Sequence, residues 1–210
     1  MDQTNKKLER IFAHPGLTKD DFIKLFGIGY PSLYSLRRDV YWCRAIDPKH
    51  NKILFEGAGS PLASIVLMRI LLDYLVNLCS SNFQNYITRY FKTKLDMEQL
   101  EVLNRLRNAI VHKSYNLVWF PKEAEKGKIT YFAITVEQIA PLIEQIKESD
   151  ADESWAINID KLHQEIEYSI NNLYKQALKD GRLSKKIMNF ASDHLMHVVS
   201  LEVFARYKNH

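Results

Sequence analysis

Residues 60–91 read SPLASIVLMRILLDYLVNLCSSNFQNYITRYF and form the dominant apolar stretch of the chain. Ser60 can cap a helix, and Pro61 suits the first helical position. The apolar residues that follow are too many for one narrow stripe, so this helix should be covered on most sides. We therefore expect a helix of about thirty residues to be the central element around which the fold packs.

A second long helix is predicted over residues 94–113, KLDMEQLEVLNRLRNAIVHK, after a break near Lys94. Asp96 is placed to cap it. Four apolar residues recur at helical spacing and share one face: Leu100, Leu103, Leu106 and Ile110. We expect this helix to lie antiparallel to the first, with that face inward.

The hydrophobic period then changes from 3.6 to 2, which indicates strands. NLVWF (116–120) and KITYFAI (128–134) alternate around the turn-forming EAEKGK, so a β-hairpin is expected at about 116–135. Thr135 and Gln138 form a capping box that opens a predicted helix, VEQIAPLIEQIKE, although Pro141 falls in its first turns. Two further helices are expected, at about 155–178 and 184–207. These elements predict a mainly α fold, a helical bundle with a small hairpin insertion.

Residues 1–59 are expected to be an N-terminal helical extension of a main domain over 60–210. Within the extension, TKDDFIKLFGIGYPSLYSLRRD (18–39) resembles a helix-turn-helix, whose second helix would turn four side chains outward: Tyr30, Tyr34, Arg37 and Arg38. Ile23 stands where that motif usually has a small residue, and Pro31 lies early in the second helix. A helical hairpin used only for packing is therefore the preferred interpretation.

Composition narrows the class of protein. The net charge of +4 permits a polyanionic partner such as RNA but does not require one. Cys43 and Cys79 are too far apart in sequence for a CxxC pair, so neither a disulfide scaffold nor a cysteine-based zinc site is expected. The first residues lack the apolar core of a secretory signal, and no uninterrupted apolar run of 18 residues follows. We therefore expect a cytoplasmic protein without a membrane span.

The second long helix carries the one motif with specific chemical meaning, RLRNAIVHKSYNL at 105–117. Asn108 and His112 are four residues apart and share a helix face, on which Arg105 also falls. Arg107 is rotated by about 100° from Asn108 and flanks them. The polar group lies away from the apolar face, so it could line a cleft.

LRNAIVHKSYNL resembles the RNxxxH signature of the HEPN superfamily, helical domains of prokaryotic toxin–antitoxin and defence systems, many of which are metal-independent endoribonucleases. The likeness is sharp over about 103–116, rests on helix order over about 60–205, and does not cover 1–59. It implies a homodimer whose two motifs meet at a cleft, RNA as substrate and no cofactor.

The resemblance also implies a role for each residue of the motif. His112 would move protons, Arg107 would hold the phosphate, and Asn108 would position His112 or the substrate. Arg105 is the rival phosphate clamp, and with Lys113 it would make the cleft electropositive and bind RNA. An antitoxin protein is a further partner that the resemblance suggests.

Arg69 and Asp73 are four apart inside the apolar helix, where charged residues usually pair with each other or with a neighbour. The resemblance implies that Asp73 orients Arg107 or His112. On the last predicted helix, Asp193, His194 and His197 have a spacing that could hold a metal, but a solvated helix face is the preferred interpretation. The alternative function is a non-catalytic module that binds a nucleotide or a protein partner, or a helix-turn-helix regulator.

Overall fold

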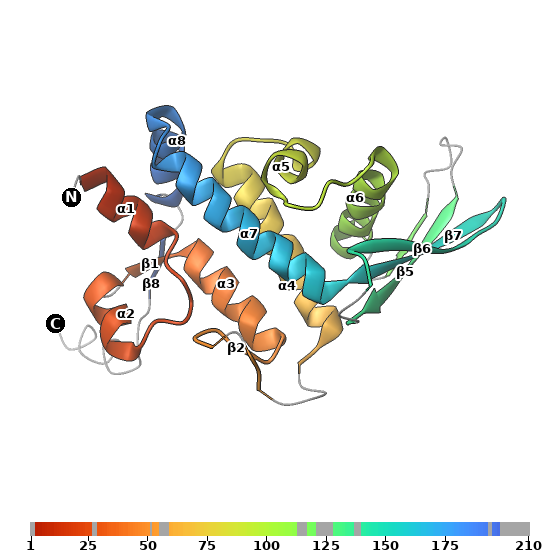
Figure 1. The fold of residues 1–210 in the computed structure, drawn as a ribbon, viewed down its shortest axis with the longest axis horizontal. Coiled ribbons are helices and arrows are strands. Elements are labelled where there is room, and N and C mark those ends of the chain that lie inside the picture. Colours follow the sequence, from red (N-terminus) through yellow and green to blue (C-terminus); the bar gives the residue numbers. More distant parts are fainter. Residues whose placement is uncertain are drawn as a thin grey trace.

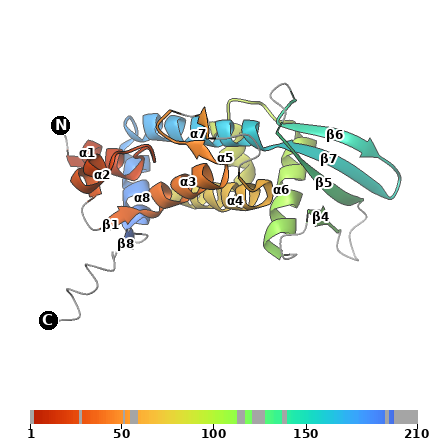
Figure 2. The same cartoon turned by 90° about the horizontal axis from the view of Figure 1, so that it is seen from below.

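The computed structural model describes residues 3–26, 29–50, 52–54, 59–112, 117–120, 128–136, 140–192 and 195–197. Its helices are α1 (Gln3–Ile11), α2 (Lys19–Phe26), α3 (Ser32–Cys43), α4 (Pro61–Leu78), α5 (Phe83–Tyr90), α6 (Met97–His112), α7 (Ile159–Ala177) and α8 (Gly181–Ser192). Its strands are β1 (Gly29–Pro31), β2 (Ile46–Asp47), β3 (Lys52–Ile53), β4 (Val118–Trp119), β5 (Ile129–Thr135), β6 (Ile143–Glu148), β7 (Asp152–Asn158) and β8 (Leu195–His197). The helices gather around α4 and α7, and the main sheet lies at one end of the molecule, beyond α6 (Figures 1 and 2).

The predicted long helix is divided into α4 and α5. α4 begins as predicted, with Pro61 in its first turn and the Ser60 hydroxyl accepting a hydrogen bond from the Ala63 amide at 3.2 Å. It ends in a Schellman turn, in which the Ser80 amide donates to Asn77 O and the Ser81 amide to Val76 O, each at 3.0 Å. Asn82 then caps α5. The expectation of one continuous helix is therefore wrong at residues 79–82.

α4 lies at the centre of the hydrophobic core. It packs against α3, α7 and α8, and its residues Met68, Leu71 and Leu75 are fully buried. Among the described helices α4 has the length and hydropathy that a membrane span requires, but half of it is buried inside the protein. This is the pattern of a core helix, and it is compatible with a soluble protein.

Two of the N-terminal helices, α1 and α3, share this core. Leu8 and Ile11 of α1 and Leu33 of α3 belong to the same buried cluster as the α4 residues. β1 pairs with β8 in antiparallel fashion, with Tyr30 opposite Met196. The described part of residues 1–59 thus packs against α4 and pairs with β8 near the other end of the chain.

A four-stranded mixed sheet, ordered β4-β5-β7-β6, replaces the isolated hairpin. The predicted hairpin pairing is present, with Val118 opposite Tyr131, but β5 continues parallel to β7, and β7 pairs antiparallel with β6. The prediction of a mainly α bundle with only a small hairpin insertion is therefore wrong, because the protein has an α/β fold.

The error arose at residues 135–158. The capping box assigned residues 136–148 to a helix, and the next helix was predicted to begin near Trp155. Pro141 lacks the amide that a helix would need. The residues after it lie in β6 and β7, where backbone pairing with distant strands satisfies them. Asn158 ends β7 and caps α7 by accepting from the amides of Asp160 and Lys161. The helix predicted to start near 155 therefore starts at Ile159.

α6 begins where it was predicted to begin. The Asp96 carboxylate accepts from the Gln99 amide at 2.8 Å, and the Gln99 side chain accepts from the Asp96 amide at 3.2 Å, which is a capping box. Leu103, Leu106 and Ile110 are each at most 4% exposed, as expected. The expected antiparallel packing is wrong, because α6 crosses α4 instead of lying along it (Figure 2).

The chain that leads into α6 is fastened to α7. The buried carboxylate of Glu165 accepts hydrogen bonds from the amides of Lys92, at 2.7 Å, and Thr93, at 3.2 Å, and from the Thr93 hydroxyl. One side chain of α7 thus fixes the linker between α5 and α6 and sets where α6 starts.

Candidate functional site

The motif helix α6 lies between the helical core and the sheet (Figure 2). Residues 105 and 107 differ by two positions, so their side chains leave a helix in nearly opposite directions. Arg107 extends toward α4, and Arg105 extends toward the sheet. The two arginines of the motif therefore have different surroundings and different roles.

Arg107 is held by a carboxylate on α4. Its Nε donates to the Asp73 Oδ1 at 3.3 Å, while its side chain remains 40% exposed. Among the described residues, no other partner of the guanidinium is found. Its terminal nitrogens can therefore donate to an incoming anion in the forked geometry that suits phosphate.

Asp73 is in turn held by Arg69, four residues earlier on the same helix, as predicted. The side chain of Arg69 is 4% exposed, and its guanidinium lies 5.2 Å from the centre of the Phe83 ring. Burial raises the pKa of Asp73 to about 6, whereas the two neighbouring guanidinium groups favour its charged form. Phe83, Arg69 and Asp73 thus form a support that fixes the direction of Arg107.

Arg105 belongs to a different ion pair. Its guanidinium contacts the carboxylate of Glu153 on β7 and lies 3.3 Å from the Thr130 hydroxyl on β5. Glu153 is 4% exposed and Thr130 fully buried. A guanidinium committed to a buried carboxylate is a poor phosphate clamp, so the geometry favours Arg107 over Arg105.

Sequence reasoning did not find Glu153 and Thr130, because it placed residue 153 outside any strand. The parallel register sets Thr130 opposite Glu153, on the face of the sheet that α6 covers. The signal that could have found Glu153 is the spacing of Glu153, Trp155 and Ile157 at every second position of DESWAIN. A strand interpretation would have placed all three side chains on one face of the sheet.

The rest of the motif is described in part. Asn108 is half-buried on α6, and His112 is the last residue of that helix. The side chain of His112 and all of Lys113 lie outside the described residues, as do Asp193 and His194 of the proposed metal group. Among the residues that are described, no group of three His, Cys, Asp or Glu side chains is arranged to hold a metal.

The helix-turn-helix, the less favoured interpretation of residues 18–39, fails on burial. Tyr30, Tyr34 and Arg37 are at most 6% exposed, so the prediction that they face outward is wrong. Arg37 donates to both carboxylate oxygens of Glu167 on α7, at 3.1 and 2.6 Å, and to the carbonyls of Phe12 and Ala13. β1 and α3 therefore turn these side chains inward and do not present them to a DNA groove.

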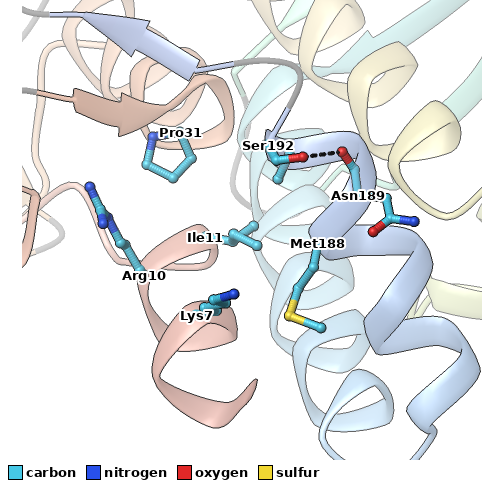
Figure 3. Close-up of a pocket in the computed structure, with 8 residues that line it drawn as sticks. Lys7, Arg10, Ile11, Pro31, Met188, Asn189 and Ser192 are labelled. Atoms are coloured by element: carbon cyan, nitrogen blue, oxygen red, sulfur yellow. Dashed lines mark hydrogen bonds between the residues drawn. The ribbon is translucent and has the colours of Figure 1, made fainter. Parts of the chain in front are cut away.

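A cavity of about 390 Å³ lies far from the motif, between α1, β1 and α8 (Figure 3). Ile11, Pro31 and Met188 form its apolar wall, and Lys7 lies at its edge. Arg10 is turned away to donate to the Phe26 carbonyl at 2.9 Å. This cavity brings none of the predicted site residues together.

No family model, no curated protein and no solved structure matches this chain.

Proposed function

We propose that this protein is a metal-independent endoribonuclease that uses the RNxxxH face of α6, with Arg107, Asn108 and His112 as the catalytic residues. The observation that carries the proposal is the half-exposed guanidinium of Arg107, held in one direction by Asp73 and Arg69. The mixed sheet is not part of a helical bundle, so the proposal depends on the HEPN-like motif and its chemistry rather than on the overall fold.

Arg107 would stabilise the transition state of phosphodiester transesterification. Negative charge grows on the nonbridging oxygens as the 2′-oxygen attacks phosphorus, and a fixed cation close to them lowers the barrier. Because Asp73 holds Nε, the guanidinium is oriented before the substrate arrives. Asp73 and Arg69 are therefore positioning residues, which act through Arg107.

His112 would carry the proton transfers, since imidazole titrates near neutral pH. The 2′-hydroxyl loses its proton as the bond from the 2′-oxygen to phosphorus forms, and the 5′-oxygen gains a proton as its bond to phosphorus breaks. The products are a 2′,3′-cyclic phosphate and a 5′-hydroxyl. Asn108, one turn before His112, would position that imidazole or the substrate.

We further infer a homodimer through the exposed face of α4. Leu62, Val66 and Ile70 follow one another at intervals of four residues, and Leu62 and Ile70 are 42% and 45% exposed. Asp73 and Asn77 continue the same face. An apolar stripe that leads to the partner of Arg107 would bring two motif sites together when a second copy covers it.

The setting that fits this activity is RNA cleavage in the cytoplasm by a toxin or defence protein, with an antitoxin as a regulating partner. The second candidate function is an RNA-binding module without catalysis. This candidate is favoured because Arg105 is committed to Glu153. Of the two motif arginines, Arg107 alone is then left to contact phosphate and to stabilise the charge of a transition state.

The test is cleavage of a single-stranded RNA by purified protein in excess chelator, with a DNA of the same sequence as the inert substrate, since DNA lacks the 2′-hydroxyl. His112→Ala should lower the rate by about 10²- to 10⁴-fold, and Arg107→Ala by about 10²- to 10³-fold. His50→Ala and Arg38→Ala are matched controls, because His50 is an exposed histidine and Arg38 a half-exposed arginine paired with Asp39.

Binding separates the two candidate functions. RNA affinity should fall as salt rises in either case, because bound phosphates release counterions. A parent protein that binds RNA but cuts none, with or without divalent metals, would leave the binding module as the function. Equal cleavage by the parent and by His112→Ala would exclude His112 as the catalytic group.

A further inference from the structure

A second cavity, of about 370 Å³, lies at the end of α4, where α5 and the start of α8 meet it. Its wall is polar and includes the Ser80–Ser81 turn. Three cationic side chains border it: Arg89 from α5 and Arg182 and Lys186 from α8. Its volume is in the range of small-molecule sites, about 300 to 1,000 Å³.

The positive charge of this cavity is not neutralised from within. The one carboxylate at its wall is Asp180, whose Oδ1 accepts from the amides of Arg182, at 2.9 Å, and Leu183, at 3.1 Å, and so caps α8. Among the described residues, none of the three cations is ion-paired with a carboxylate. A cavity with three positive charges and one negative charge attracts anions.

Arg89 and Lys186 act electrostatically on the Cys79 thiol, which also lines the cavity. Burial raises the pKa of the Cys79 thiol to about 11, and the positive charges of Arg89 and Lys186 act against that rise. Arg89 is also fixed in place, because it donates to the Gln176 side chain at 2.9 Å and its guanidinium lies 5.2 Å from the Tyr90 ring centre. A guanidinium fixed in this way loses less entropy when it binds an anion.

The turn that closes the cavity has an unusual conformation. Ser80 has a φ of 51°, in the left-handed region where glycine is the common residue at this point of a Schellman turn. The backbone amides of Ser80 and Ser81 are used within the turn. The cavity wall therefore carries a serine hydroxyl where a glycine would terminate the helix with less strain.

We propose that this cavity binds a small phosphate-bearing molecule, with Arg89, Arg182 and Lys186 as the phosphate ligands. Guanidinium groups match phosphate oxygens in pairs, and an ammonium group adds a compact positive charge. The volume exceeds that of a phosphate group alone, so a nucleotide is the expected size of ligand. The site is separate from Arg107 and does not depend on RNA cleavage.

The test is calorimetric titration of the full chain with inorganic phosphate, with 5′-AMP and with a short single-stranded RNA. The variants are Arg89→Gln, Arg182→Gln, Lys186→Gln and the triple substitution. Each single variant should weaken binding by about tenfold or more, the scale of one charged hydrogen bond, and the triple variant should abolish it. Lys147→Gln, on the exposed strand β6, removes one charge elsewhere and should bind as the parent does.

The three probes identify the source of the phosphate. Binding of phosphate and 5′-AMP indicates a free nucleotide-sized ligand, whereas binding of RNA alone that the triple variant loses indicates a phosphate of the RNA backbone at the same site. The proposal is overturned if the parent binds none of the probes at millimolar concentration, or if the triple variant binds as tightly as Lys147→Gln does. Arg107→Ala should keep the binding of 5′-AMP, so failure of the nuclease proposal and failure of this one are distinguishable.

Discussion

Arg105→Ala should lower stability and spare RNA cleavage, whereas Arg107→Ala should do the reverse, although the two residues are only two positions apart on α6. Arg105 is 23% exposed and pairs with Glu153, whose side chain is 6% exposed. Its removal leaves a buried carboxylate without its cation, which typically costs about 3 to 5 kcal/mol, and the partial exposure of Arg105 favours the lower value, about 3 kcal/mol. In a chain of this length that corresponds to a fall in Tm of roughly 6 to 12 °C.

Arg107 and Asp73 are 40% and 33% exposed, and an ion pair that water reaches contributes only about 0 to 1 kcal/mol. Arg107→Ala should therefore unfold within a few degrees of the parent, while it should lose the proposed RNA cleavage. Arg105→Ala, measured at a temperature where it is folded, should cleave RNA at nearly the parent rate.

The assay is urea unfolding followed by circular dichroism, with RNA cleavage measured on the same preparations. The double variant Arg105→Met/Glu153→Gln should recover most of the lost stability, because a neutral glutamine can still accept from the Thr130 hydroxyl. The reasoning is refuted if Arg105→Ala loses less than about 1 kcal/mol, or if the folded variant has lost cleavage.

Three further results are expected. Asp73→Asn should slow RNA cleavage by about tenfold or more with little change in substrate affinity, because it frees the guanidinium of Arg107 from its fixed direction. An unchanged rate constant would show that Asp73 does not position Arg107. Ile70→Asp should convert the proposed homodimer to a monomer in sedimentation at micromolar concentration, whereas Ile23→Asp, at an exposed isoleucine of α2, should not. A dimer that survives the α4 substitution places the interface elsewhere. His163 is 5% exposed, and burial, with a further contribution from the charges of Arg44 and Arg37, lowers its pKa from 6.5 to about 4. Because the unfolded state binds the proton more readily, stability should fall as pH drops from about 6.5 to 4, by on the order of 2 to 3 kcal/mol, and an unfolding series with His163→Phe should lack this component of the pH dependence.

Local signals predicted the elements that local contacts stabilise. The Asp96 cap and the inward leucines of α6 needed only residues within one helix, and both are confirmed. The predicted antiparallel pairing of the two hairpin strands is also confirmed, with Val118 opposite Tyr131.

The errors lie where distant parts of the chain decide the outcome. Residues 143–148 have an ambiguous hydrophobic pattern, and they form a strand because β7 is available to pair with them. Arg37 is buried because Glu167, 130 positions away, accepts its hydrogen bonds. Asp73 was predicted to orient Arg107 or His112, and it does contact Arg107. The partners of Arg105 depend on a strand register, which no local pattern specifies.

The contact between Glu165 and the linker before α6 has a consequence for how the protein folds during synthesis. α6 leaves the ribosome well before the residues that anchor it, because Glu153 and Glu165 come later in the sequence. At translation rates of about 5 to 20 residues per second, the roughly 60 residues between the motif and Glu165 take on the order of 3 to 12 s to appear. During that interval a nascent chain carries Arg107 and His112 without the contacts that fix α6, so the proposed nuclease would become active only once α7 has been made.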